Sequence, residues 1–69
     1  MRTLTVDGRK VAELRERKGW TQQTAARKMG ISRALVSFIE VGERQPSAQV
    51  ALQIVRALGV DLDEILVDA

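Results

Sequence analysis

The sequence has 69 residues, 45% of them hydrophobic, and a formal net charge of +2. This length suits one small domain, close to the lower limit for a core that is stable without cross-links. Because the chain has no cysteine and no histidine, disulfides and the usual soft metal ligands are excluded, and little remains for thiol or imidazole catalysis. We therefore predict a protein that is not an enzyme and binds no metal or cofactor. No apolar run approaches the roughly 20 residues of a membrane span, which predicts a cytoplasmic protein without a membrane partner.

The charge is distributed unevenly along the chain. Four of the nine acidic residues fall in residues 57–69, which contain no base, so residues 1–56 hold 11 bases against five acids. This asymmetry favours a basic docking face with an acidic end turned away from it. A solvated surface of mixed charge is equally consistent with the composition.

The N-terminal residues 2–6, R-T-L-T-V, have the composition of a short β-strand. A lone strand is not stable, so the candidate partners are I-L-V at 65–67 or the same segment of a second subunit. A frayed terminus is the alternative. Asp7 follows as the expected N-cap of a helix at 8–18, which Gly19 ends.

Residues 21–40, T-Q-Q-T-A-A-R-K-M-G-I-S-R-A-L-V-S-F-I-E, predict two short helices joined by a tight turn. Thr21 and Ser32 stand at N-cap positions, where a hydroxyl can accept hydrogen bonds from the free N–H groups of the first turn. Gly30 stands at the turn, where the backbone needs a positive φ. The second helix has one apolar face and a small mixed strip opposite, a shape suited to the DNA major groove. The strip consists of Arg33, Ala34, Ser37 and Val41.

The rest of the chain predicts two more helices. After the loop V-G-E-R-Q-P-S at 41–47, Ser47 can cap a helix at 47–58, whose predicted core face consists of Val50, Ala51, Ile54, Val55 and Leu58. Asp61 and Glu64 have the spacing of a capping box for a short last helix at about 62–66.

These elements resemble the helix-turn-helix domain of Cro/C1-type phage repressors and xenobiotic-response-element regulators. The matching marks are T-Q at 21–22, Ala26, Gly30, I-S-R at 31–33, I-E at 39–40, Gly42 and P-S at 46–47. The resemblance covers about residues 8–66. It implies one domain at 1–69 with the all-α, five-helix lambda-repressor-like fold, with the short N-terminal strand as a possible addition. It also implies a bacterial or phage-encoded, nucleoid-associated protein.

The DNA contacts follow from this arrangement. Arg33 opens the recognition helix and can bind guanine O6 and N7, with a phosphate contact as the alternative. Ala34 and Ser37 are short enough for close approach, and Ala34 could meet a thymine methyl. These three residues are the predicted base readers. The predicted phosphate contacts are Gln22, Thr21, Ser32, Arg44 and Gln45.

Arg15 and Glu40 both fall toward apolar faces of their helices, where an unpaired charge would be costly. Members of the resembled family commonly join these two positions in a partly buried ion pair. We therefore expect the pair to connect the first helix to the recognition helix.

Four further positions depart from the family pattern or stay ambiguous. Trp20 replaces a smaller aliphatic residue and Ala25 replaces a leucine, so the indole can fill the volume that alanine leaves. A stacking role for Trp20 is the alternative. Phe38 lies between the core and DNA faces, where packing against the 42–46 loop is favoured over a base contact. Val41 replaces a residue that is commonly basic or polar.

One recognition helix covers too few base pairs to select an operator among many genomic sites. We therefore predict a homodimer on palindromic double-stranded DNA, with half-sites about 34 Å apart. The predicted interface is Leu62, Ile65, Leu66 and Val67. Alternatively, the first three residues close the core and leave only Val67 at the surface.

The predicted function is sequence-specific DNA binding and transcriptional regulation by a small dimeric repressor, with no small-molecule effector evident. Two alternatives stay open. The domain could serve as an antitoxin or restriction-modification controller, or it could be a protein-interaction module that no longer binds DNA.

Overall fold

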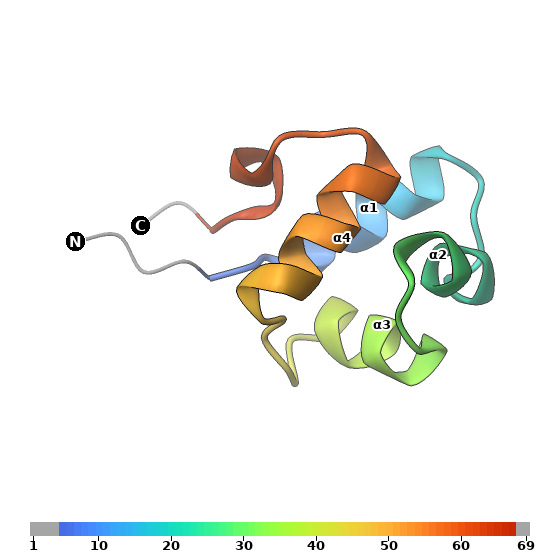
Figure 1. The fold of residues 1–69 in the computed structure, drawn as a ribbon, viewed down its shortest axis with the longest axis horizontal. Helices are drawn as coiled ribbons and strands as arrows, with labels where there is room; N and C mark the ends of the chain where they lie inside the picture. Colours follow the sequence, from blue (N-terminus) through green and yellow to red (C-terminus); the bar gives the residue numbers. More distant parts are fainter. Residues whose placement is uncertain (1–4, 68–69) are drawn as a thin grey trace.

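The computed structural model describes residues 5–67, which form four α-helices and a closing 3₁₀ turn (Figure 1). The elements are α1 (Gly8–Arg17), α2 (Gln22–Met29), α3 (Arg33–Glu40), α4 (Ala48–Leu58) and the 3₁₀ turn η1 (Leu62–Ile65). The four predicted helices are confirmed, each within a residue or two of its expected ends. No helix in the described part is both long and apolar enough to cross a bilayer.

Each α-helix begins with a side-chain cap, as the sequence predicted. The Oδ1 atom of Asp7 accepts a hydrogen bond from the Arg9 N–H at 3.1 Å. The hydroxyls of Thr21, Ser32 and Ser47 each accept from the N–H three residues later, at 3.1, 3.0 and 3.2 Å. These bonds satisfy donors that a helix start would otherwise leave free.

The predicted fifth α-helix is wrong in type. Residues 62–65 form a single 3₁₀ turn, and the predicted capping box is absent, because the Asp61 side chain makes no capping hydrogen bond. Leu66 already has the extended backbone angles φ −89° and ψ 147°. The chain therefore has only four residues between the extended positions 61 and 66, which is too short for more than one tight turn.

The two ends of the described chain pair with each other. Val6 and Leu66 form an isolated antiparallel β-bridge. On either side, the Asp7 N–H donates to the Ile65 carbonyl at 2.7 Å and the Val67 N–H donates to the Thr5 carbonyl at 2.8 Å. Residues 65–67 are thus the partner of residues 5–6, one of the predicted alternatives; residues 2–4 of the expected strand lie outside the described residues. Figure 1 shows the blue and red segments running side by side.

The core lies where all four helices and η1 meet. Its largest fully buried side chains are Ile39, Ile54, Ile65, Val11 and Val36. Gly8 lets the start of α1 approach the end of α3, since a Cβ there would collide with the Ile39 carbonyl oxygen and lie 2.8 Å from that of Glu40. This close approach helps to set the position of α3 against the core.

Candidate nucleic-acid interface

The outer side of α3 is open to solvent along its length. Arg33 and Ala34 are exposed, Ser37 is half-buried, and Val41, the C-cap, is exposed. On the opposite side Val36 and Ile39 are each only 2% exposed. The predicted strip therefore lies together on one surface of the helix, backed by a buried apolar face.

Phe38 belongs to the same surface, although packing against the following loop was the favoured expectation. Its side chain is 41% exposed, and it is not among the apolar residues that pack against the core. The 43–44 segment folds back on Phe38: the N–H groups of Glu43 and Arg44 donate to the Phe38 carbonyl at 2.9 and 3.3 Å. The loop thus fixes the backbone at Phe38 and leaves much of its ring in water.

Arg15 and Glu40 form the ion pair that the sequence indicated. The Arg15 Nε donates to Glu40 Oε2 at 2.7 Å and a terminal guanidinium nitrogen donates to Oε1 at 3.1 Å, with side-chain exposures of 14% and 6%. The other terminal nitrogen donates to the Trp20 carbonyl at 2.8 Å. The hydrogen bonds that Arg15 donates to Glu40 raise the pKa of Arg15 above its ordinary value, against the opposing effect of desolvation.

Gln22 extends this network to the start of α2. Its side-chain nitrogen donates to Glu40 Oε1 at 3.0 Å, so one carboxylate accepts hydrogen bonds from α1 and from α2. The C-terminal end of α3 is therefore tied to both neighbouring helices by directional bonds. The second N–H of the Gln22 amide and the open N–H groups of the first turn of α2 remain for an anion.

Of the other four predicted phosphate-binding residues, three already use their side chains in hydrogen bonds within the described part of the chain. Thr21 and Ser32 use their hydroxyl oxygens as helix caps, and the Thr21 hydroxyl also lies 3.1 Å from that of Thr24. Arg44 is exposed in the loop after α3. Gln45 has a structural role that the sequence did not predict: its amide accepts from the Val6 N–H at 2.8 Å and donates to the Val6 carbonyl at 3.1 Å.

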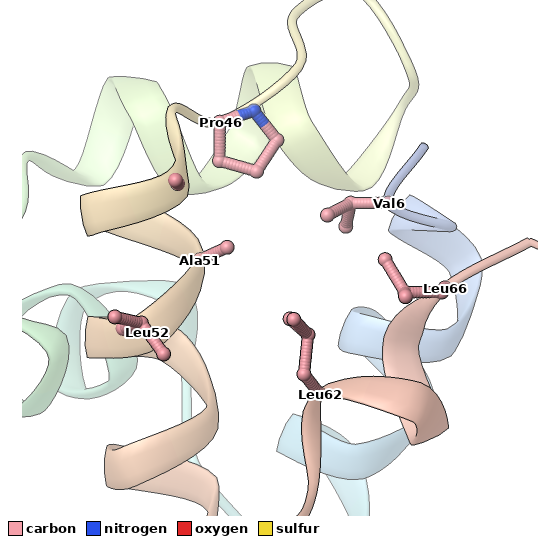
Figure 2. A pocket seen from close by; sticks show the side chains of 7 residues that line it. Val6, Pro46, Ala51, Leu52, Leu62 and Leu66 are labelled. Atoms are coloured by element: carbon pink, nitrogen blue, oxygen red, sulfur yellow. The ribbon is translucent and has the colours of Figure 1, made fainter. Parts of the chain in front are cut away.

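The predicted dimer surface needs one correction. Ile65 is 0% exposed and belongs to the core of the monomer, so it cannot lie in an interface. Leu62 and Leu66 are half-buried and line an apolar pocket of about 240 Å³, which Figure 2 shows between α4, η1 and the N-terminal segment. The other lining residues are Val6, Pro46, Ala48, Ala51 and Leu52.

Leu52 is the residue of this surface that the sequence analysis missed. It is 46% exposed, beside the pocket, and Val67 is 44% exposed at the end of the described chain. The available signal was its place on α4: the predicted core positions of that helix fall on one face, and Leu52 falls off it.

Trp20 is half-buried and packs against the core, to which the fully buried Ala25 also belongs. The Nζ atoms of Lys18 and Lys28 each lie 5.3 Å from the centre of the indole ring. These contacts favour the structural role over a stacking role, because two cations and the core occupy the surroundings of the ring.

Comparison with known proteins adds a family and a fold. Residues 11–65 match the family model described as Helix-turn-helix. YazB of Bacillus subtilis, described as an uncharacterized HTH-type transcriptional regulator, is 36% identical over 58 residues, which cover 84% of each chain. The restriction-modification controller protein C.AhdI from Aeromonas hydrophila superposes with a TM-score of 0.80 at 35% identity, covering 83% of this chain and 86% of that one. The biofilm master regulator SinR, solved in complex with DNA, superposes with a TM-score of 0.77 at 26% identity, covering 81% and 90%.

Proposed function

We propose that this chain, which belongs to the Cro/C1-type helix-turn-helix family of DNA-binding transcriptional regulators, is a small dimeric repressor of a palindromic operator. The observation that carries the proposal is the exposed strip of α3, backed by a buried face and held at its C-terminal end by Arg15 and Gln22 through Glu40. A helix held this firmly can enter the major groove and bring its short outer side chains to the base edges. Such a protein would act in the cytoplasm, on the nucleoid.

Within this proposal Arg33 reads a guanine, and Ala34 and Ser37 face the neighbouring base edges. Phosphate contacts are assigned to Gln22, Thr21, Ser32 and Arg44. Gln45 would contribute only through its second amide N–H, because its carbonyl and first N–H already bind Val6. The hydrogen bond between Gln22 and Glu40 supports the first of these assignments, since it orients the amide beside the open N–H groups of α2.

A mobility-shift experiment with random and selected duplexes at two salt concentrations tests DNA binding. Arg33→Ala should weaken binding to the selected site by about 1–3 kcal/mol and relax the preference at one base pair. Arg44→Ala, the control in the neighbouring loop, should weaken all sequences alike and reduce the salt slope by about one. An unchanged base preference in the Arg33 variant would show that Arg33 does not recognise a base. If the parent binds no duplex, the alternative of a protein-interaction module that no longer binds DNA would be favoured.

The dimer is proposed to form through the apolar pocket and its rim. Pro46, in the loop that follows α3, is one of the residues that line the pocket (Figure 2). In a two-fold interface the same patch occurs on both sides, so the exposed Leu52 and Val67 of one protomer can fill the pocket of its partner. The acidic residues at 61, 63 and 64 lie on this closing segment, and the assignment keeps them away from the DNA phosphates.

Sedimentation at micromolar concentration should show a dimer of the parent. Leu52→Asp and Val67→Asp should each shift it to monomer while helicity stays unchanged, because both side chains are exposed in the monomer and a charge buried in an apolar interface is costly. Gln23→Asp, which adds the same charge at an exposed site on α2, should leave the dimer intact. A parent that stays monomeric alone and on DNA, bound to a single half-site, would contradict the dimer.

A second candidate function has its own support. C.AhdI, a restriction-modification controller, matches this chain at 35% identity over most of both chains. A controller of that kind would use the same DNA contacts in a different circuit. The neighbouring genes distinguish the two: genes for a methyltransferase and an endonuclease beside this one would favour the controller.

A further inference from the structure

Large hydrophobic side chains are exposed at few places in the described part of the chain. They are Phe38 (41%), Val41 (66%), Leu52 (46%) and Val67 (44%). The last two border the pocket of the proposed dimer. The first two lie on α3 and its C-cap, so they belong to the surface proposed to face DNA.

Helix geometry divides the outer side of α3 into two edges. At about 3.6 residues per turn, the outer residues follow one another around the helix in the order Arg33, Ser37, Val41, Ala34, Phe38. Arg33 and Ser37 thus form a polar edge, and Val41, Ala34 and Phe38 form an apolar edge beside it. The recognition surface thus has a hydrogen-bonding edge and an apolar edge, and in the described part of the chain Phe38 and Val41 of the apolar edge stay 41% and 66% exposed.

Resting on the proposed DNA-binding function, we propose that Phe38, with Ala34 and Val41, recognises the 5-methyl groups of thymine in the operator. The thymine methyl is the apolar group of the major-groove floor, and alanine and phenylalanine side chains suit it. Cytosine at the same position lacks the methyl and presents an amino group, which the apolar edge would desolvate without a partner. The apolar edge therefore favours thymine by contact with its methyl group and disfavours cytosine by desolvating its amino group.

The geometry also places the thymines relative to the guanine read by Arg33. Phe38 follows Arg33 by five residues, about 7.5 Å along the helix axis, and successive bases of one strand lie about 3.4 Å apart. The methyl groups should therefore lie within about two base pairs of that guanine. The backbone bonds that Glu43 and Arg44 make to the Phe38 carbonyl hold this end of α3 in place, so the backbone at Phe38 need not be ordered on binding.

Replacing thymine by deoxyuridine in the selected operator removes the methyl and leaves every hydrogen-bonding group. The full-length parent should lose about fourfold in affinity for each methyl that Phe38 or Ala34 contacts, the factor that corresponds to one methyl-sized group withdrawn from water. Phe38→Ala should bind the thymine and deoxyuridine sites nearly alike, whereas Phe38→Leu should retain most of the preference. Arg33→Ala, the matched control on the polar edge, should lose its guanine preference and keep the thymine preference.

Replacing the thymine by 5-methylcytosine and by cytosine separates the two parts of the selection, since the first should bind better than the second. Sequence-specific binding with equal affinity for thymine and deoxyuridine would overturn the inference and leave the proposed function standing. Selected operators that lack thymine within two base pairs of the guanine would also overturn the inference and leave the proposed function standing. Failure to bind any duplex would overturn both. Deoxyuridine sensitivity that persists unchanged in Phe38→Ala would assign the methyl contact to other residues and also overturn it.

Discussion

The helix-turn-helix at residues 21–40 and the closing segment at 61–67 are built by different interactions. α2 and α3 each begin with a hydroxyl cap, and the end of α3 is held by hydrogen bonds to one buried carboxylate. η1 has no side-chain cap, although Asp61 stands at the capping position. It is held by the buried Ile65 and by backbone bonds to the N-terminal segment.

This difference matches the two surfaces that we propose. A base-reading helix must be fixed closely in position and direction, because hydrogen bonds to base edges tolerate little displacement. An apolar interface depends on area and shape more than on the direction of individual bonds. Directional polar contacts are therefore concentrated around α3, and apolar burial with backbone pairing suffices for the segment beside the pocket.

Glu40→Ala should have the largest effect, because it removes the acceptor shared by Arg15 and Gln22. With side-chain exposures of 14% and 6% for Arg15 and Glu40, the loss of one partner should lower the free energy of unfolding by about 3 kcal/mol. Arg15→Ala should cost a similar amount, and the double variant should be no less stable than either single variant. Urea unfolding of the four proteins measures these values; single variants as stable as the parent would show that the pair contributes little.

The pH dependence of this pair has a definite sign. The hydrogen bond to Glu40 raises the pKa of Arg15, so the stabilisation from the arginine is fully present below its ordinary pKa and is lost only as the pH rises through the raised value. The difference in stability between the parent and Arg15→Ala should therefore stay constant from about pH 7 to about pH 9. A difference that shrinks across this range would contradict the assignment.

Gly8→Ala should have the next largest effect, because it acts on the junction of α1 and α3. A Cβ there would collide with backbone carbonyls at the end of α3, and relieving the collision should cost about 2–3 kcal/mol. Gly19→Ala is the control: Gly19 has a φ of 73° with nothing within 4 Å of its Cβ position, so backbone strain alone should cost about 1–2 kcal/mol. Thermal unfolding compares the two, and a Gly8 variant as stable as the parent would show that α1 and α3 can separate freely.

The helix-turn-helix at residues 21–40 was predicted well from the sequence, because its signals are local. Thr21, Gly30 and Ser32 each act on residues a few positions away, so caps and turns around α2 and α3 could be placed from spacing alone. The resemblance to the family supplied the one long-range contact, between Arg15 and Glu40. Phe38 was placed between two faces because a helical position alone does not tell how far the next loop covers it.

The closing segment was predicted less well for the opposite reason. Leu66 pairs with Val6, a residue far away in sequence, and the turn ends before it. The sequence analysis named 65–67 as one possible partner of residues 2–6, but the capping-box spacing of Asp61 and Glu64 favoured a helix that continued to 66. Val6 also exchanges two hydrogen bonds with the side chain of Gln45, another contact between residues far apart in sequence. Ile65 was assigned to the interface, whereas one turn packed against α1 and α4 buries it completely, as the alternative interpretation of this segment expected.

Removing the residues at the capping positions one at a time should change the free energy of unfolding least. These variants test most directly whether the helix-turn-helix and the closing segment depend on different kinds of bond. Ser32→Ala deletes a hydroxyl that accepts from the Leu35 N–H at 3.0 Å, and it should lower the free energy of unfolding by about 1 kcal/mol. Asp61→Ala deletes a side chain at the same helical position that makes no such bond, so its effect should stay within about 0.5 kcal/mol. Urea unfolding at one pH and salt concentration measures both. Equal losses would mean that Asp61 caps η1 in solution, and the closing segment would then depend on the same kind of directional bond as the recognition helix.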